Sequence, residues 1–152
     1  GTGGQMDIKI GASISRNLIA HATLISNTME HPTVKLSNST ESQVYNNLVV
    51  GEAVVGVGLT YYVMPYNIFF SGSGGLGNFS TVHTDNKALN AISNKGFSWQ
   101  LKMGKEWWIS RNWGLGFGFT FGKTTTKNIP YNSAIEKLDS NRFAVLLNAT
   151  FD

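Results

Sequence analysis

Hydrophobic and polar positions alternate with a period of two along most of the 152-residue chain. In one example, Leu115, Phe117 and Phe119 fall on one side of the chain, and Gly or Thr occupies each position between them and after Phe119. Alternation of this kind places the two sets on opposite faces of a β-strand. The pattern predicts seven strands, at residues 6–15, 18–27, 49–64, 68–80, 97–109, 113–123 and 142–151.

The segments between these strands are alternately short and long. Tight turns are predicted at Arg16-Asn17, at 65–67 and at 111–112. The segments around 28–48, 81–96 and 124–141 are long, polar and rich in Asn, Ser and Thr. Short turns on one rim and long loops on the other are typical of up-and-down barrels in bacterial outer membranes. We therefore expect one all-β, antiparallel barrel domain over residues 1–152.

The composition of the two strand faces indicates which of them meets the surroundings. The polar face is mostly Gly, Ser and Thr, which suits a crowded interior better than a surface in water. The opposite face carries branched and aromatic side chains on every strand, and charged residues make up only 14% of the chain against about a quarter in soluble domains. The sequence thus favours a transmembrane β-barrel with its apolar face toward lipid. The alternative is a soluble barrel or sandwich with its large apolar residues inside.

Several other classes of protein are disfavoured. No run of about 18 apolar residues could form a membrane helix. The absence of cysteine excludes disulfides, thiolate metal sites and thiol nucleophiles. The net charge of +3 is not gathered into a basic stripe, so we expect no nucleic-acid partner.

Aromatic residues gather around the predicted tight turns. Trp and Tyr concentrate at membrane–water interfaces, where an amphipathic ring is well solvated on one side and buried on the other. The alternative is that these rings are ordinary core residues. The predicted aromatic girdle consists of Tyr61, Tyr62, Tyr66, Trp107, Trp108 and Trp113.

Polar and charged residues on the inward faces are candidates for a network in the lumen. These residues are Asp7, Lys9, Glu52, Gln100, Lys102, Glu106 and Arg142. Acidic and basic members are equal in number, and buried charges must pair or become neutral. An eight-stranded barrel is narrow enough to be filled by its own side chains. We expect an interior ion-pair network, with a narrow polar conduit as the alternative.

One lysine does not fit this scheme. Strict alternation directs Lys105 toward lipid, near the rim with the tight turns. Either its long side chain reaches back to the interface, or a bulge at Gly104 shifts the register.

Two aromatic hairpins carry a family resemblance. The stretch KMGKEWWISRNWGLGFG at 102–118 resembles a motif of small outer-membrane β-barrel proteins from myxobacteria and their relatives. Residues 56–67 and, more weakly, 15–21 are similar to other parts of that family. The resemblance implies an eight-stranded, OmpA-like barrel and no particular activity. The chain departs from the usual terminal aromatic assembly signal of such barrels, because Phe151 is followed by Asp152.

No catalytic, cofactor or metal site emerges. The three histidines, His21, His31 and His83, are dispersed and form no recognisable nucleophilic or metal-binding pattern. We expect a structural or interaction role, with membrane lipids and lipopolysaccharide as partners. The alternatives are a small pore, a homo-oligomer packed through Gly72 and Gly74, and an enzyme that modifies envelope lipid.

The strand count predicts that the barrel is incomplete. Single-chain bacterial barrels have an even number of strands and both termini at the periplasmic rim. Strand 6–15 leads into a tight turn, so it begins at the outer rim, and the five residues before it reach at most about 18 Å. We expect a missing first strand between 6–15 and 142–151. It would be encoded upstream, be present as a separate piece, or be donated by a neighbouring protomer.

Overall fold

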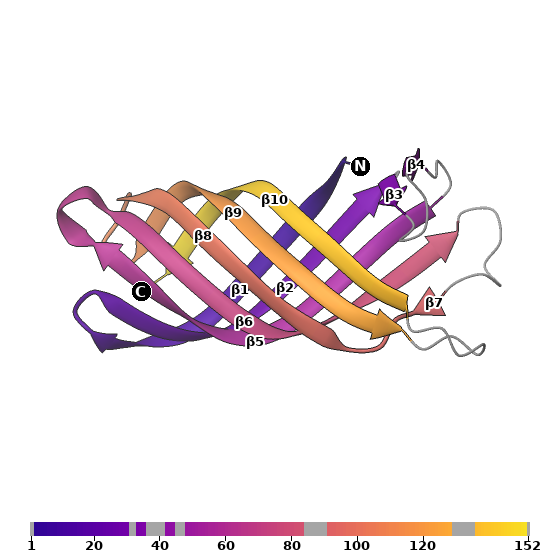
Figure 1. The fold of residues 1–152 in the computed structure, drawn as a ribbon. Coiled ribbons are helices and arrows are strands. Elements are labelled where there is room, and N and C mark those ends of the chain that lie inside the picture. The colour runs from indigo at the N-terminus through magenta and orange to yellow at the C-terminus, as the bar shows by residue number, and fades with distance from the viewer. Residues whose placement is uncertain are drawn as a thin grey trace.

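The computed structural model of the protein describes residues 2–30, 33–35, 42–44, 48–83, 91–128 and 136–151. Seven long strands form an antiparallel, up-and-down sheet in sequence order, and the sheet curls into a half-barrel (Figure 1). This confirms the all-β class and the seven predicted strands. The strands are β1 (Thr2–Ser15), β2 (Leu18–Glu30), β5 (Leu48–Val63), β6 (Ile68–His83), β8 (Gly96–Trp108), β9 (Trp113–Asn128) and β10 (Glu136–Phe151).

The strands extend beyond their predicted ends into the segments expected to be loops. For example, Ser140 pairs with Thr124 and Asp139 with Thr125, although all four lie within 124–141. Three short strands were also not expected: β3 (Thr33–Lys35) and β4 (Ser42–Val44) form a hairpin, and β7 (Ala91–Ile92) pairs with β6. In the extended parts of β9 and β10 the hydrophobic alternation disappears because polar residues such as Thr124, Thr125 and Asp139 occupy both faces, whereas backbone pairing continues.

The tight turns lie together at one end of the sheet, which we call the turn end; the opposite end is the loop end. The turn between β1 and β2 consists of residues 16–17, and residues 109–112 join β8 to β9. Between β5 and β6 lies the 3-10 helix η1 (Met64–Tyr66), followed by Asn67 in the left-handed region at φ 50°. Asparagine tolerates this conformation better than most residues, so the Pro65-Tyr66-Asn67 sequence suits the turn.

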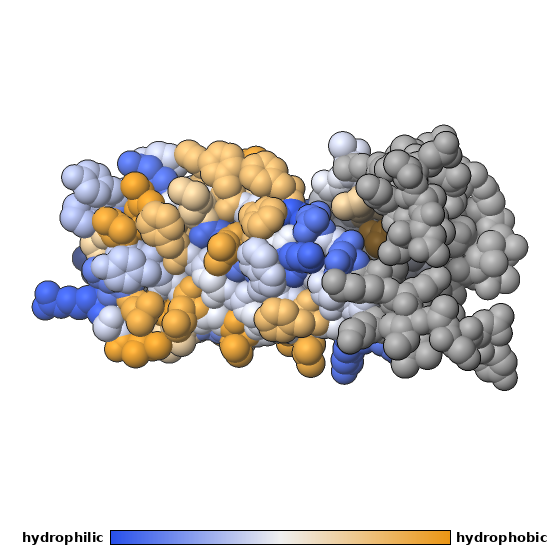
Figure 2. Space-filling model, in the orientation of Figure 1, coloured by the Kyte–Doolittle hydropathy of each residue, from blue (hydrophilic) through white to orange (hydrophobic). Residues whose placement is uncertain are grey.

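Burial is inverted relative to a protein with an apolar core. Among the described residues, the buried apolar side chains are only Ile25, Val54, Phe69 and Phe79, whereas twelve polar or charged residues are buried. Large apolar side chains are exposed on every long strand, with Leu147 93% exposed. Figure 2 shows apolar side chains spread over the outside of the strands. No helix in the described part of the chain has the length and apolar character needed to cross a membrane.

The sheet has two free edges, β1 and β10. Each pairs with only one neighbour, and the strand order of the described residues contains no ladder between them. Seven strands that alternate in direction leave the first and last running the same way. Both edges therefore run from the loop end to the turn end, as the N and C marks in Figure 1 indicate.

Candidate functional site

The concave face of the sheet holds the main cluster of polar groups. The structure places all seven residues of the predicted lumen network on this face, at three levels between the loop end and the turn end. The levels are centred on Glu52, Asp7 and Glu106.

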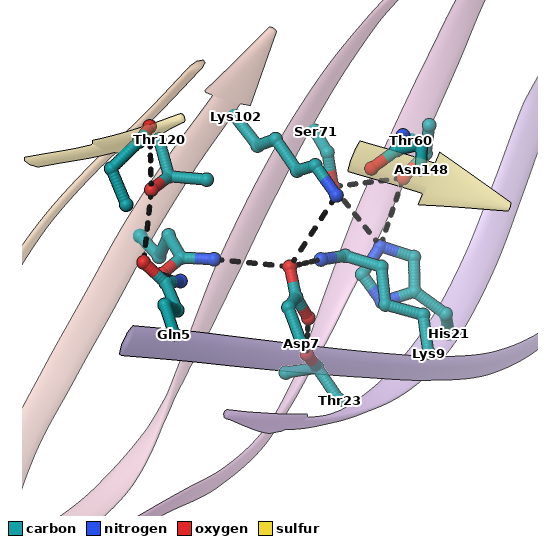
Figure 3. A network of polar contacts seen from close by, with 12 residues as sticks. Gln5, Asp7, Lys9, His21, Thr23, Thr60, Ser71, Lys102, Thr120 and Asn148 are labelled. Atoms are coloured by element: carbon teal, nitrogen blue, oxygen red, sulfur yellow. Dashed lines mark hydrogen bonds and ion pairs between the residues drawn. The ribbon is translucent and has the colours of Figure 1, made fainter. Parts of the chain in front are cut away.

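The central level surrounds the Asp7 carboxylate on β1. Lys9 forms an ion pair with this carboxylate, and the Nζ atom of Lys102 on β8 lies 3.7 Å from Asp7 Oδ2. The side chains of Gln100 and Thr23 donate hydrogen bonds to the same carboxylate at 3.2 Å each. Two cations and two neutral donors thus compensate one anion whose side chain is 1% exposed (Figure 3).

Gln5 extends this level toward β9. Its amide nitrogen donates to Gln100 Oε1 at 2.8 Å, and its oxygen accepts from the Thr120 hydroxyl at 3.1 Å. The side chain of an edge strand therefore reaches across the interior to the opposite wall.

A second group of polar side chains adjoins the Asp7 network (Figure 3). The Thr60 hydroxyl on β5 donates to Ser71 Oγ on β6 at 2.8 Å. His21 Nε2 on β2 lies 3.0 Å from Thr60 Oγ1 and 3.3 Å from Ser71 Oγ. All three residues are buried. Both described hydrogen-bond partners of the imidazole are hydroxyl groups.

The level nearest the loop end is an ion pair between Glu52 on β5 and Arg142 on β10. Both side chains are almost completely buried, at 4% and 6% exposure. The guanidinium also donates to Thr124 Oγ1 at 2.7 Å and to Ser98 Oγ at 3.2 Å. Asn27 donates to the other carboxylate oxygen of Glu52 at 3.2 Å. The pair joins opposite walls of the half-barrel and fills the space between them.

The level nearest the turn end centres on Glu106, which is 1% exposed. Its carboxylate accepts hydrogen bonds from Tyr62 at 3.2 Å, Asn148 at 3.0 Å and Thr150 at 2.9 Å. Glu106 thus connects β8 to β5 and to the edge strand β10 through neutral donors.

A cavity of about 740 Å³ occupies the concave face between the central level and the turn end. Lys9, His21, Tyr62, Lys102 and Trp108 are among the residues that line it. In the loop-side half, Ser98, Thr124 and Thr126 are buried at 0–1% exposure, and the first two bond to the Arg142 guanidinium. The interior is therefore divided into a packed half and an open half.

The aromatic residues near the turns are distributed over both faces. Tyr61, Tyr66 and Trp107 are 49%, 64% and 49% exposed. The Trp113 ring packs edge-to-face against the Phe151 ring, with 5.3 Å between the ring centroids. Trp108 is 40% exposed and lines the cavity together with Trp113.

Tyr62 lies apart from the other aromatic residues of the predicted girdle. Its hydroxyl points into the interior and bonds to Glu106. The alternation of β5 places Tyr62 on the same face as buried Thr60, so the sequence did contain this signal.

Lys105 stays on the outer face. The β8–β9 ladder runs through Gly104 and Lys105 without a register shift, so no bulge is present there. The ammonium group lies 5.7 Å from the centre of the Trp107 ring. A cation above an aromatic face is stabilised electrostatically, which gives this outward lysine a local partner.

Several network members were not among the predicted site residues. Thr124 was assigned to a loop, so its bond to Arg142 could not be anticipated. Asn27, Asn148 and Thr150 lie at inward positions of predicted strands, but alternation alone does not indicate which neutral side chain reaches a charge. His31 lies outside the described residues.

The described residues contain no group of three or more His, Cys, Asp or Glu side chains placed to hold a metal ion. In comparisons with protein-family models, curated proteins and solved structures, nothing matches the chain significantly.

Proposed function

We propose that the protein is a β-barrel of a bacterial outer membrane with a structural or interaction role. The observation that carries this proposal is the inverted burial: the convex face exposes large apolar side chains, and the concave face buries charges. An exposed apolar surface of this extent is unfavourable in water and favourable against lipid. A soluble barrel would have the opposite distribution.

The apolar outward residues of β9 and β10 cover a length along the barrel axis that is close to the thickness of the apolar part of a membrane. From Trp113 to Phe121, every second residue of β9 is apolar, and the next outward residue is Lys123. Eight residue steps at about 3.3 Å, tilted by about 40°, span roughly 20 Å along the barrel axis. This is close to the apolar band of about 25 Å in outer-membrane barrels. On β10, outward Phe143 is followed toward the loop end by Asn141 and Asp139.

The packing of the interior supports a structural role rather than transport. The Glu52–Arg142 pair and the packed threonines occupy the loop-side half, which argues against a continuous conduit. The proposed partners are the lipids and lipopolysaccharide that surround the barrel. The resemblance of residues 102–118 to small outer-membrane barrels agrees with this proposal.

Cell fractionation and detergent dependence test the membrane proposal. The protein is expected to float with membrane vesicles in a density gradient and to aggregate when detergent is removed. A soluble β-protein expressed in the same cells serves as the control for trapping in vesicles. A folded, monomeric protein that stays in solution without detergent would defeat the proposal.

A further inference from the structure

The two free edges of the sheet enclose a groove that leads into the interior. The 740 Å³ cavity is lined by inward residues of β1 such as Asp7 and Lys9 and by inward residues of β10 such as Asn148. It is also lined by Met6 and Leu147, which lie on the outer face. A cavity that contacts both faces of both edge strands passes between them. The cavity therefore continues outward as a gap between β1 and β10.

Within the described part of the chain, each edge leaves one row of backbone N–H and C=O groups without a strand partner. In lipid, every unpaired group of this kind costs several kcal/mol. This step depends on the membrane proposal above, because water would otherwise satisfy the groups. An occupant of the gap must supply backbone donors and acceptors, which a lipid acyl chain lacks.

The direction of the edges limits the occupant further. Because β1 and β10 run the same way, pairing them directly would create a parallel ladder in an otherwise antiparallel sheet. A second copy of the chain, inserted in the membrane in the same orientation, would also form a parallel ladder, because its β1 runs parallel to β10 of the first copy. A single strand running from the turn end to the loop end is antiparallel to both edges.

The flanking side chains indicate the composition of such a strand. Its outward neighbours are Met6, Ile8 and Ile10 on β1 and Val145 and Leu147 on β10, which are 40–93% exposed. Its outward residues must be apolar to continue this surface. Its inward residues face the Asp7 and Lys9 level and the Glu106 level, where small or polar side chains fit. A tilted strand of about 9–11 residues crosses the apolar core of a membrane.

We propose that the gap between β1 and β10 is a binding site for one additional polypeptide strand. The strand is antiparallel to both edges, apolar on its outward residues and small or polar on its inward residues. Its insertion completes an eight-stranded barrel and closes the side of the cavity.

Cysteine crosslinking can test this site without background, because the chain contains no cysteine. Leu147→Cys is combined with Met6→Cys, Ile8→Cys or Ile10→Cys, and the protein is oxidised in lipid vesicles. Across an intervening strand the two edges lie about 10 Å apart, beyond the roughly 7 Å limit for a disulfide. As a matched control, Leu147→Cys is combined with Phe117→Cys, its register partner on β9. The control pair reports that the sheet is folded.

A strand of suitable direction is available as a probe. The peptide Trp113–Asn128 corresponds to β9, which is antiparallel to β10 and has apolar outward and small inward residues. A peptide carrying Phe117→Cys is added during refolding of chains with a single cysteine at Ile8 or Leu147. A peptide of the same composition in scrambled order is the control.

The expected result is a disulfide in the control pair, none between the edges, and crosslinks of the β9 peptide to both Ile8→Cys and Leu147→Cys. The scrambled peptide should react at least tenfold less. Efficient direct disulfides between β1 and β10 would overturn the proposal, as would failure of the peptide to reach either edge. A bound lipid that excludes the peptide would also overturn it. Failure of the membrane proposal is distinguishable, because the protein would then fold without detergent or vesicles.

Discussion

The Glu52–Arg142 ion pair is almost completely buried, with side chains that are 4% and 6% exposed. Removing only one partner leaves a buried charge without compensation, which typically costs about 3–5 kcal/mol. Replacing both partners by apolar residues of similar volume is often close to neutral. We therefore predict that Arg142→Met lowers the unfolding free energy by about 3–5 kcal/mol and that the Glu52→Met/Arg142→Met double variant recovers most of the loss. Urea unfolding in detergent micelles measures both.

Lys123→Met is the matched control for this prediction. Lys123 pairs with Asp139 at 3.6 Å, but both side chains are about one-third exposed. Exposed pairs contribute roughly 0–1 kcal/mol. Equal losses for Arg142→Met and Lys123→Met would contradict the account of a buried interior pair.

Outward residues in the middle of the apolar band should not tolerate a charge. Leu147→Arg or Phe117→Arg would place a guanidinium in the hydrocarbon region, at a cost of about 2–4 kcal/mol. Asn141→Arg lies on the same face of β10, beyond the apolar band, and should cost about 0–1 kcal/mol. Unfolding in lipid vesicles compares the three variants. If arginine is tolerated equally at positions 147 and 141, lipid does not surround β10.

At the scale of single residues, the sequence was informative about faces and less so about partners. Alternation assigned Asp7, Glu52 and Arg142 to the inner side because each strand has only two faces. The partner of each charge depends on the curl of the sheet, which brings β5 opposite β10. No local pattern contains that curvature.

Among the elements, β8 and β9 leave no room for a side chain at Gly116, which faces the interior. A Cβ atom at Gly116 would lie 2.1 Å from the backbone oxygen of Lys105 and 2.9 Å from Glu106 Cγ, whereas one at Gly114 would have no neighbour closer than 3.6 Å. We predict that Gly116→Ala destabilises the protein by about 1–3 kcal/mol through overpacking. Gly114→Ala should change stability by about 0.5 kcal/mol or less.

Chemical denaturation of the two alanine variants under identical detergent conditions checks this difference. Gly114→Ala is a matched control for Gly116→Ala because both glycines lie on the same strand and the same face. Similar stability of the two variants would mean that the β8–β9 spacing relaxes without cost.

The number and order of the long strands were predictable, and their full lengths were not. The hydrophobic alternation marks the band from Trp113 to Phe121 and ends at Lys123, but β9 continues to Asn128. Backbone pairing does not require apolar side chains, and threonine favours strands. Thr124, Thr125 and Thr126 therefore extend the sheet where the hydrophobic pattern predicts a loop.

At the scale of the whole molecule, the packed loop-side half argues against a pore. Single-channel recording in planar bilayers should give no large, steady openings. The double variant Glu52→Ala/Arg142→Ala lacks the ion pair that spans the interior. Its conductance is expected to exceed that of the unaltered protein. Large steady conductance in the unaltered protein would favour the pore over the structural role.

Lipid contact of the convex face is the central claim, and the reactivity of single cysteines in vesicles tests it most directly. Leu147 is 93% exposed in the structure, and Asp139 is exposed on the same face of β10 near the loop end. A water-soluble maleimide is expected to label Asp139→Cys rapidly and Leu147→Cys only after the protein is unfolded. Rapid labelling of Leu147→Cys in the folded protein would contradict the account, because water would then reach the face assigned to lipid.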